Sequence, residues 1–176
     1  MLTICTEEAQ AAVSICKFPP RLGASKLVIG KRSLTAGVPH FGYKPTSPAE
    51  TMTQLDASGS CVVLMIKTAD SIENLDAIAT VPGVDMLLIG ANDLSLELGI
   101  QEKWDDPLFK DTLNRVAEAC KNSGIVMGLA GLYTRPDICE DAINRLGIRY
   151  ILGNLDIALI AAAAKTNVAA LRALQR

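Results

Sequence analysis

The sequence predicts an α/β fold in which parallel strands alternate with helices. Short apolar runs of strand length, such as residues 61–67 and 84–90, recur along the chain and are typical of strands buried on both faces. A segment with helical spacing of apolar residues follows each run, which favours parallel pairing through right-handed crossovers. Two architectures share this pattern, a doubly wound sheet and a βα-barrel.

Composition and charge narrow the class of function. The chain has 176 residues, of which 49% are hydrophobic and 20% charged, so residues 1–176 are expected to form a single globular domain. The 17 basic and 19 acidic side chains are interspersed, which argues against nucleic-acid or membrane partners. The apolar runs are shorter than the ~20 residues of a bilayer span, and the N-terminus lacks a signal-peptide pattern. We therefore expect a cytoplasmic protein that acts on a small molecule.

The first third of the chain is predicted to hold one helix and a long loop. Thr6 is a suitable N-cap for a helix over residues 6–17, and Glu7 and Glu8 stand in its first turn, where the helix dipole favours negative charge. Residues 19–60 are rich in Pro, Gly, Ser and Thr and show little periodicity. We expect them to form a long irregular loop, which in compact domains is often functional.

Four strand and helix units follow this loop. The run at 61–67 is the first strand, and Asp70 and Glu73 have capping-box spacing at the start of a helix over 70–81. Further helices are expected from Asp106-Pro107 to Gly124, over 135–147, and over the alanine-rich residues 155–174. The other strands are predicted at 84–90, 125–131 and 149–153, so that Lys67, Gly90, Gly131 and Gly153 share one end of a parallel sheet.

The segment "GANDLS", residues 90–95, follows the second strand. In both architectures the carboxyl ends of parallel strands form the active face. Gly90 allows a ligand to approach the backbone, the amides of Asn92 and Asp93 can face an anion, and the Asp93 carboxylate can hold a cation. Alternatively, Asp93 is only the N-cap of a short helix. Local sequence leaves both interpretations open.

Three segments of the chain, in order, resemble the HpcH/HpaI family of class II, metal-dependent aldolases. They are "TEEAQAAVSICKFPP", "NLDAIATVPGVDMLLIGANDLSLELGI" and "GIRYILGNLDIALIAAA". The resemblance implies a TIM-type (β/α) barrel, here an incomplete one of about four to five βα units with a possible strand stub at residues 1–5. It further implies a homo-oligomer that exchanges C-terminal helices. The implied activity is a carbon-carbon lyase that cleaves 2-keto acids to pyruvate and an aldehyde through a metal-stabilised enolate.

The resemblance also assigns roles to individual residues. Asp93 falls on the family's metal-ligand aspartate, with Mg²⁺ or Mn²⁺ as the expected ion. Gly90 and Asn92 fall on the loop that holds the pyruvate carboxylate, and Arg21 falls near an arginine-glycine loop of the active face. The family's second metal ligand is a glutamate, and this chain has Lys67 at its position.

Lys67 leads to two hypotheses. A lysine at the end of a barrel strand, beside a pyruvate site, is where a Schiff-base aldolase carries its nucleophile. The simpler hypothesis is an ion pair between Lys67 and Asp93 in place of the metal. The N-terminal half that supplies the family's histidine and substrate arginine is not in this sequence, and the single histidine, His40, lies in the irregular segment. A catalytically inactive paralogue or an assembly subunit is therefore the alternative to an active enzyme.

Overall fold

The computed structural model describes residues 5–19, 30–34 and 37–174, and its centre is one sheet of four parallel strands. The strands lie in the order β1-β2-β3-β4, and the register pairs Met65 with Leu88 and Gly90 with Ala130. This confirms the predicted α/β fold and the four predicted strands, and it brings their carboxyl ends to one edge. Their bounds are β1 (Val63–Ile66), β2 (Met86–Gly90), β3 (Val126–Ala130) and β4 (Tyr150–Ile151).

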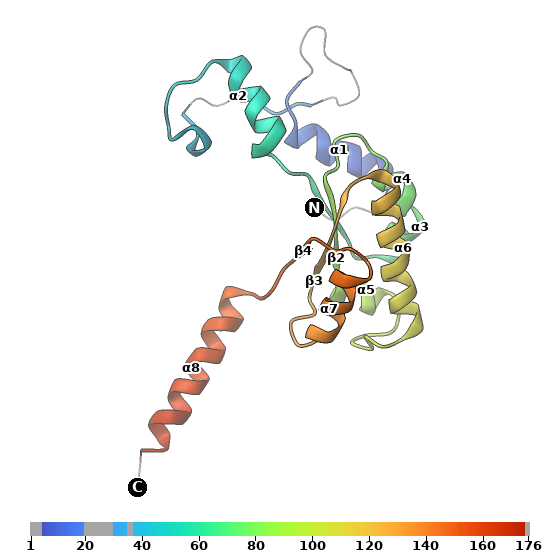
Figure 1. Cartoon of the computed structure of the whole chain (residues 1–176), viewed down its shortest axis with the longest axis vertical. Helices are drawn as coiled ribbons and strands as arrows, with labels where there is room; N and C mark the ends of the chain where they lie inside the picture. The colour runs from blue at the N-terminus through green and yellow to red at the C-terminus, as the bar shows by residue number, and fades with distance from the viewer. Residues whose placement is uncertain (1–4, 20–29, 35–36, 175–176) are drawn as a thin grey trace.

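Helices connect the strands and pack on the sheet. Figure 1 shows α3, α4 and α6 together on one side of the strands, whereas α8 extends away from the body. No helix within the described residues is long and apolar enough to cross a membrane. In chain order the elements are α1 (Thr6–Cys16), the 3₁₀ turn η1 (Pro39–Phe41), α2 (Pro48–Gln54), the π-helical turn η2 (Leu55–Gly59), α3 (Ala69–Glu73), α4 (Leu75–Ala79), α5 (Ala91–Glu97), α6 (Pro107–Ser123), α7 (Pro136–Asn144) and α8 (Asp156–Arg172).

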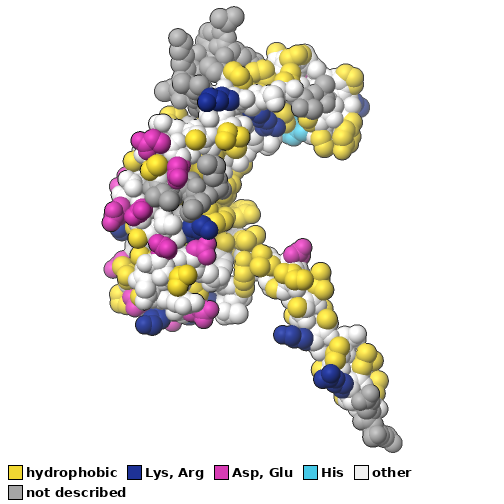
Figure 2. All heavy atoms as spheres, turned by 180° about the vertical axis from the view of Figure 1, so that it is seen from behind, with side chains coloured by type: hydrophobic (Ala, Val, Ile, Leu, Met, Phe, Trp, Pro, Cys, Tyr) yellow, Lys and Arg dark blue, Asp and Glu magenta, His cyan; other side chains and the backbone are white. Residues whose placement is uncertain are grey.

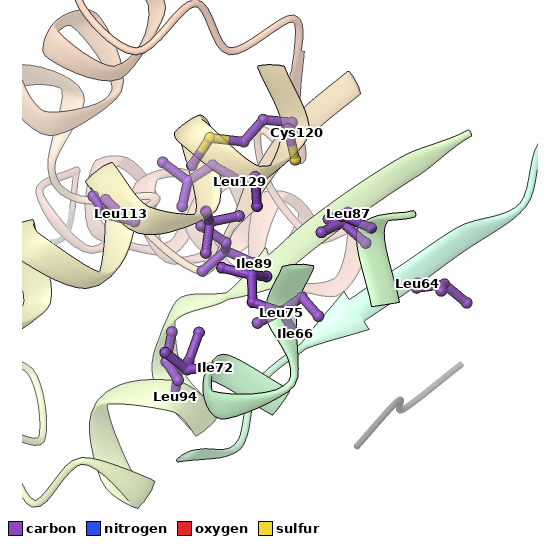
Figure 3. Close-up of a cluster of buried hydrophobic side chains, with 14 of the residues drawn as sticks. Leu64, Ile66, Ile72, Leu75, Leu87, Ile89, Leu94, Leu113, Cys120 and Leu129 are labelled. Carbon is purple, nitrogen blue, oxygen red and sulfur yellow. The ribbon is translucent and has the colours of Figure 1, made fainter. Parts of the chain in front are cut away.

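The hydrophobic core lies between the sheet and the helices that cover it (Figure 3). Alternate residues of β1, β2 and β3 face these helices and are almost fully buried, because successive side chains of a strand point to opposite faces. From the helices, α6 contributes the face that its 3.6-residue period predicts. The strand residues are Leu64, Ile66, Leu87, Ile89, Met127 and Leu129, and those of α6 are Phe109, Leu113, Val116 and Cys120.

The boundaries of α6 follow the predicted signals closely. The Asp106 side chain accepts a hydrogen bond from the Leu108 amide, and Pro107 fills the first helical position, where a missing N–H costs nothing. Gly124 ends the helix in the left-handed conformation, with φ of 68°. The long helix that positions the core against β2 and β3 is therefore specified locally at both ends.

Three local predictions were wrong in detail. The segment 19–60 is not irregular throughout, since Ser47 caps α2 by accepting a hydrogen bond from the Glu50 amide and η2 follows α2. The helix over 70–81 is two helices that meet at Asn74, and its capping box joins Thr68 to Ser71. The N-cap of α1 is Cys5 and not Thr6. At the start of α3, the Thr68 hydroxyl accepts a hydrogen bond from the Ser71 amide and the Ser71 hydroxyl accepts one from the Thr68 amide, so this pair satisfies the amides that Asp70 and Glu73 were expected to satisfy.

An ion pair between the buried Lys17 and the partly exposed Asp85, whose side chain is 42% exposed, joins α1 to the starting ends of β1 and β2. Lys17, with 8% of its surface exposed, places Nζ 3.3 Å from Asp85 Oδ2 and 3.0 Å from the Ser60 carbonyl oxygen. The same Asp85 oxygen accepts a hydrogen bond from the Val62 amide at 2.7 Å. One carboxylate therefore joins a helix to two neighbouring strands.

We expect Asp85→Ala to lower the free energy of unfolding by about 2 kcal/mol, because the Val62 amide and the Lys17 ammonium both lose a charged acceptor. Urea denaturation measures this change. The matched control is Asp76→Ala in the first turn of α4, an exposed carboxylate whose loss should cost at most about 0.5 kcal/mol. Equal costs for the two substitutions would contradict the role assigned to Asp85.

Candidate functional site

The carboxyl ends of β1 and β2 bring Lys67 and Asp93 together. Lys67 directly follows β1, Asp93 lies in the helix that follows β2, and the Lys67 Nζ is 2.8 Å from Asp93 Oδ2. The Lys67 side chain is 30% exposed and that of Asp93 is 56% exposed. The two charges therefore form a hydrogen-bonded ion pair that water and small solutes can reach.

The turn from β2 into α5 places three of the predicted site residues. Gly90 is the N-cap of α5, and Asp93 stands inside its first turn, so Asp93 is not the N-cap that local sequence allowed. A Cβ added to Gly90 would lie 3.5 Å from the Lys67 Cβ. The backbone between β2 and α5 thus runs close beside the base of the Lys67 side chain.

Asn92 is held from two sides. Gly131, which follows β3 with φ of 93°, lies so close that an added Cβ would be 3.2 Å from Asn92 Nδ2 and 3.3 Å from the Asn92 backbone nitrogen. On the other side, the fully buried Ser95 donates a hydrogen bond to the Asn92 carbonyl oxygen at 2.9 Å. Sequence reasoning missed Ser95, although its position three residues after Asn92 in a helix start is typical of this local bond.

Two other candidate residues do not join this group. Arg21 lies outside the described residues, so its place near the active face stays a prediction. His40 belongs to η1, and its Nδ1 would lie 3.5 Å from a Cβ added to Gly59, in the segment that leads into β1. Because Gly59 precedes β1 and Lys67 follows it, His40 lies toward the end of the sheet opposite Lys67.

Arg135, which follows β3, is engaged by carboxylates. Its guanidinium is 3.0 Å from Asp105 Oδ2 and 2.7 Å from Asp137 Oδ2. Hydrogen bonding by Arg135 lowers the pKa of Asp137 to about 2. Arg135 is thereby committed to a surface network between α6 and α7, and it is not free to bind an anionic ligand.

The Lys67–Asp93 pair is separate from three cavities on the neighbouring part of the molecule. Cavities of about 190, 330 and 380 Å³ lie along α6 and α7, and none of the three is lined by Lys67, Asn92 or Asp93. The first of them has mostly apolar walls from the carboxyl ends of β3 and β4 and from α7. A molecule bound in one of these three cavities would therefore not be lined by the Lys67–Asp93 pair.

The residues present do not fit the divalent ion that the resemblance implied. Across residues 5–19, 30–34 and 37–174, no group of three or more His, Cys, Asp and Glu side chains could hold one metal ion. The carboxylate oxygen of Asp93 instead accepts a hydrogen bond from Lys67. An ammonium has no lone pair to offer a metal and repels a cation at this distance.

A parallel sheet with its polar residues at the carboxyl edge defines the class as an α/β protein, either a doubly wound sheet or part of a βα-barrel. Comparison with known families is more specific: residues 2–145 match the HpcH/HpaI aldolase/citrate lyase family, and the chain belongs to it. The 4-hydroxy-4-methyl-2-oxoglutarate aldolase cghB of Chaetomium globosum is 41% identical over 157 residues. The aldolase of the same description from Hapsidospora irregularis, tasA, is 40% identical over 168 residues.

The chain covers only part of these relatives. The match to the Chaetomium protein takes in 89% of this chain and 55% of the relative, and the match to the Hapsidospora protein takes in 96% and 59%. The crystal structure of an HpcH/HpaI aldolase from Desulfitobacterium hafniense superposes with a TM-score of 0.78 at 22% identity, over 99% of this chain and 63% of that one. Macrophomate synthase gives a TM-score of 0.71 at 22% identity, over 97% and 56%. The fold is thus that of the family's barrel over about three fifths of its length.

The exposure of the Lys67–Asp93 pair predicts a small contribution to stability. In a double-mutant cycle with Lys67→Met and Asp93→Ala, we expect a coupling free energy below about 1 kcal/mol, because solvent screens exposed charges. Urea denaturation of the four proteins measures it. A coupling of several kcal/mol would show that the pair is a structural element of the fold.

Proposed function

We propose that this chain is a carbon-carbon lyase of the 2-oxo-acid aldolase type, with its substrate at the carboxyl ends of β1 and β2. The observation that carries the proposal is the convergence of Lys67, Gly90, Asn92 and Asp93 at that edge in a member of an aldolase family. Relatives at 41% and 40% identity are described as 4-hydroxy-4-methyl-2-oxoglutarate aldolases, which makes this compound the first substrate to test.

The chemistry of that substrate defines what the site has to do. Cleavage between C3 and C4 leaves the electron pair on C3 as the enolate of pyruvate, while the C4 hydroxyl gives its proton to a water molecule at the exposed edge and becomes the ketone of a second pyruvate. The enolate then takes a proton from water at C3. Positive charge near the former keto oxygen stabilises the enolate, and hydrogen-bond donors near the carboxylate orient the substrate. In our proposal Lys67 supplies the charge, and Asn92 and the backbone from Gly90 to Asp93 supply the donors.

A non-catalytic role is the second candidate. Lys67 stands at the position of the family's metal-ligand glutamate, and the chain spans 55% and 59% of the lengths of the relatives named above. A subunit that binds a 2-oxo acid without cleaving it would keep Asn92 and Gly90 while losing the metal. Binding of pyruvate without release of product from any substrate favours this candidate.

We expect the purified chain to release pyruvate from 4-hydroxy-4-methyl-2-oxoglutarate or from oxaloacetate, whose decarboxylation passes through the same enolate. Lactate dehydrogenase and NADH report the pyruvate formed. Asp93→Ala should lower kcat/KM at least about tenfold, because it removes the partner that holds the Lys67 ammonium in place. The control is Asp141→Ala, which removes a carboxylate paired with Arg145 outside this edge and should leave the rate unchanged. Pyruvate release from both compounds no faster than in the same solution without protein, with or without Mg²⁺ or Mn²⁺, would refute the proposed activity.

We also propose that the chain forms a homo-oligomer through α8. None of the residues of α8 is buried within the chain, and Figures 1 and 2 show the helix standing apart from the body with hydrophobic side chains along it. Exposed apolar area on this scale marks an interaction surface in other proteins. Its large exposed hydrophobic residues are Ile157, Leu159, Ile160, Val168 and Leu171.

Light scattering after size exclusion should give a mass of at least twice 18.7 kDa for the native chain. Replacing Ile157 and Ile160, which are 67% and 64% exposed, by glutamate should shift the mass toward that of the monomer, since burying two carboxylates at the contact is costly. Lys165→Glu on the same helix is the control for a change of charge alone. A native protein that is monomeric at micromolar concentration would contradict the proposed assembly.

A further inference from the structure

Lysine at position 67 changes the net charge beside Asp93. A carboxylate at position 67 beside Asp93 would give two negative charges, which a divalent cation balances. With lysine at position 67, the ammonium and the Asp93 carboxylate balance each other directly at 2.8 Å. Exchanging a carboxylate for an ammonium adds two units of positive charge, and this equals the charge of the ion.

We infer that Lys67 makes this site independent of a divalent metal, because its ammonium provides the positive charge that binds the 2-oxo acid. The identity of the ligand rests on the proposed function, whereas the metal independence rests on the geometry of the pair alone. The role of Lys67 is electrostatic and non-covalent: its Nζ donates hydrogen bonds to the ligand's oxygens and forms no bond to carbon.

The geometry gives the ammonium the required freedom. Lys67 Nζ carries three donor hydrogens, and the hydrogen bond to Asp93 Oδ2 uses one of them. The side chain is 30% exposed at the rim of the sheet, so a small anion can reach the remaining donors. Asp93 is more exposed, at 56%, so water screens its own repulsion of the anion more strongly than it screens the attraction by Lys67.

The backbone near Lys67 restricts where that anion can lie. Gly90 passes close to the base of the Lys67 side chain, and Asn92 lies close to the backbone of Gly131, after the end of β3. Lys67 follows β1 and Asn92 follows β2, its neighbour in the sheet, while the Asn92 carboxamide lies on the side of Gly131, after β3. A planar two-carbon or three-carbon acid, with a carboxylate next to a keto oxygen, can accept hydrogen bonds from the two remaining donors of Lys67.

The first arm of the experiment measures metal binding without any ligand. Mn²⁺ titration followed by electron paramagnetic resonance compares the native chain with Lys67→Glu, Lys67→Arg and Lys67→Met. We expect Lys67→Glu to bind Mn²⁺ at least about tenfold more tightly than the native chain, because it restores two adjacent carboxylates, whereas Lys67→Arg should bind no better. Equal Mn²⁺ affinity of the native chain and Lys67→Glu would overturn the inference.

A matched control separates a restored site from any pair of carboxylates. Arg145 and Asp141 form an ion pair of the same 2.8 Å length on α7, with side chains 49% and 51% exposed. Arg145→Glu creates two neighbouring carboxylates there. It should bind Mn²⁺ more weakly than Lys67→Glu, because both positions are more exposed than Lys67 and water screens them more fully. Equal affinity in the two glutamate variants would show that position 67 is not a special cation site, and it would overturn the inference.

The second arm measures ligand binding by calorimetry in excess EDTA. Oxalate, a planar dianion that resembles the pyruvate enolate, is the probe. The native chain should bind it without metal, Lys67→Met should bind it at least about tenfold more weakly, and Lys67→Arg should keep most of the affinity because it keeps the charge. Oxalate binding that requires Mn²⁺ in the native chain, or that is unchanged in Lys67→Met, would overturn the inference.

Borohydride reduction in the presence of pyruvate tests the covalent alternative. Reduction of a Schiff base would leave a mass adduct on Lys67, and such an adduct would replace the electrostatic role by a nucleophilic one and so overturn the inference. No adduct is expected. If the native chain neither binds oxalate nor releases pyruvate with or without metal, the proposed function fails, while the Mn²⁺ comparison still decides whether Lys67 excludes the metal.

Discussion

Parallel pairing of β1, β2 and β3 is the constraint on which the site depends. Because the strands run in one direction and in register, each strand ends at the same edge and the segment after it begins there. Lys67 and Asp93 are 26 residues apart in sequence, yet one strand spacing brings their side chains into contact. Leu87 and Ile89 of β2 are fully buried in the core, and their packing sets the position of Gly90 at the end of the strand.

The sequence predicted those parts of the fold whose signals are local or periodic. Apolar runs located all four strands, and Asp106 with Gly124 marked both ends of α6. The helices within 47–59 were not predicted, because the Thr, Ser and Gly residues there give no apolar periodicity. Ser47-Pro48 with Glu50 is nevertheless a recognisable helix start. The break at Asn74 could not be predicted from spacing, since the apolar residues on either side continue the same face.

That Lys67, Gly90, Asn92 and Asp93 lie near one another could be predicted, but their contacts could not, and their role as a site stays a prediction. Strand ends and the family resemblance pointed to Lys67, Gly90, Asn92 and Asp93, which lie together at the edge of the sheet. Asp93 forms a hydrogen bond with Lys67 and does not cap α5, and this depends on the conformation of the turn after β2. An aspartate at a helix start can equally be an N-cap or a partner for a distant charge, so the local sequence could not decide. Likewise, the carboxylates that occupy Arg135 come from residues 30 positions before it and two after it, and only the folded chain brings all three side chains together.

Two lysine-aspartate pairs at opposite ends of the strands show why burial, and not chemistry alone, separates structure from function. Lys17 is 11% exposed in its side chain, its ammonium also bonds to the Ser60 carbonyl, and its partner Asp85 bonds to the Val62 amide. Every strong partner of that ammonium belongs to the fold, and breaking the pair would leave buried polar groups unpaired. Lys67 is 30% exposed, with the 56% exposed Asp93 as its hydrogen-bond partner, so we expect solvent to screen the pair and the free energy of folding to depend little on it. Lys67 lies at the edge where this architecture binds its ligands. Two of its three donor hydrogens are not used by the hydrogen bond to Asp93, so they can bind a ligand.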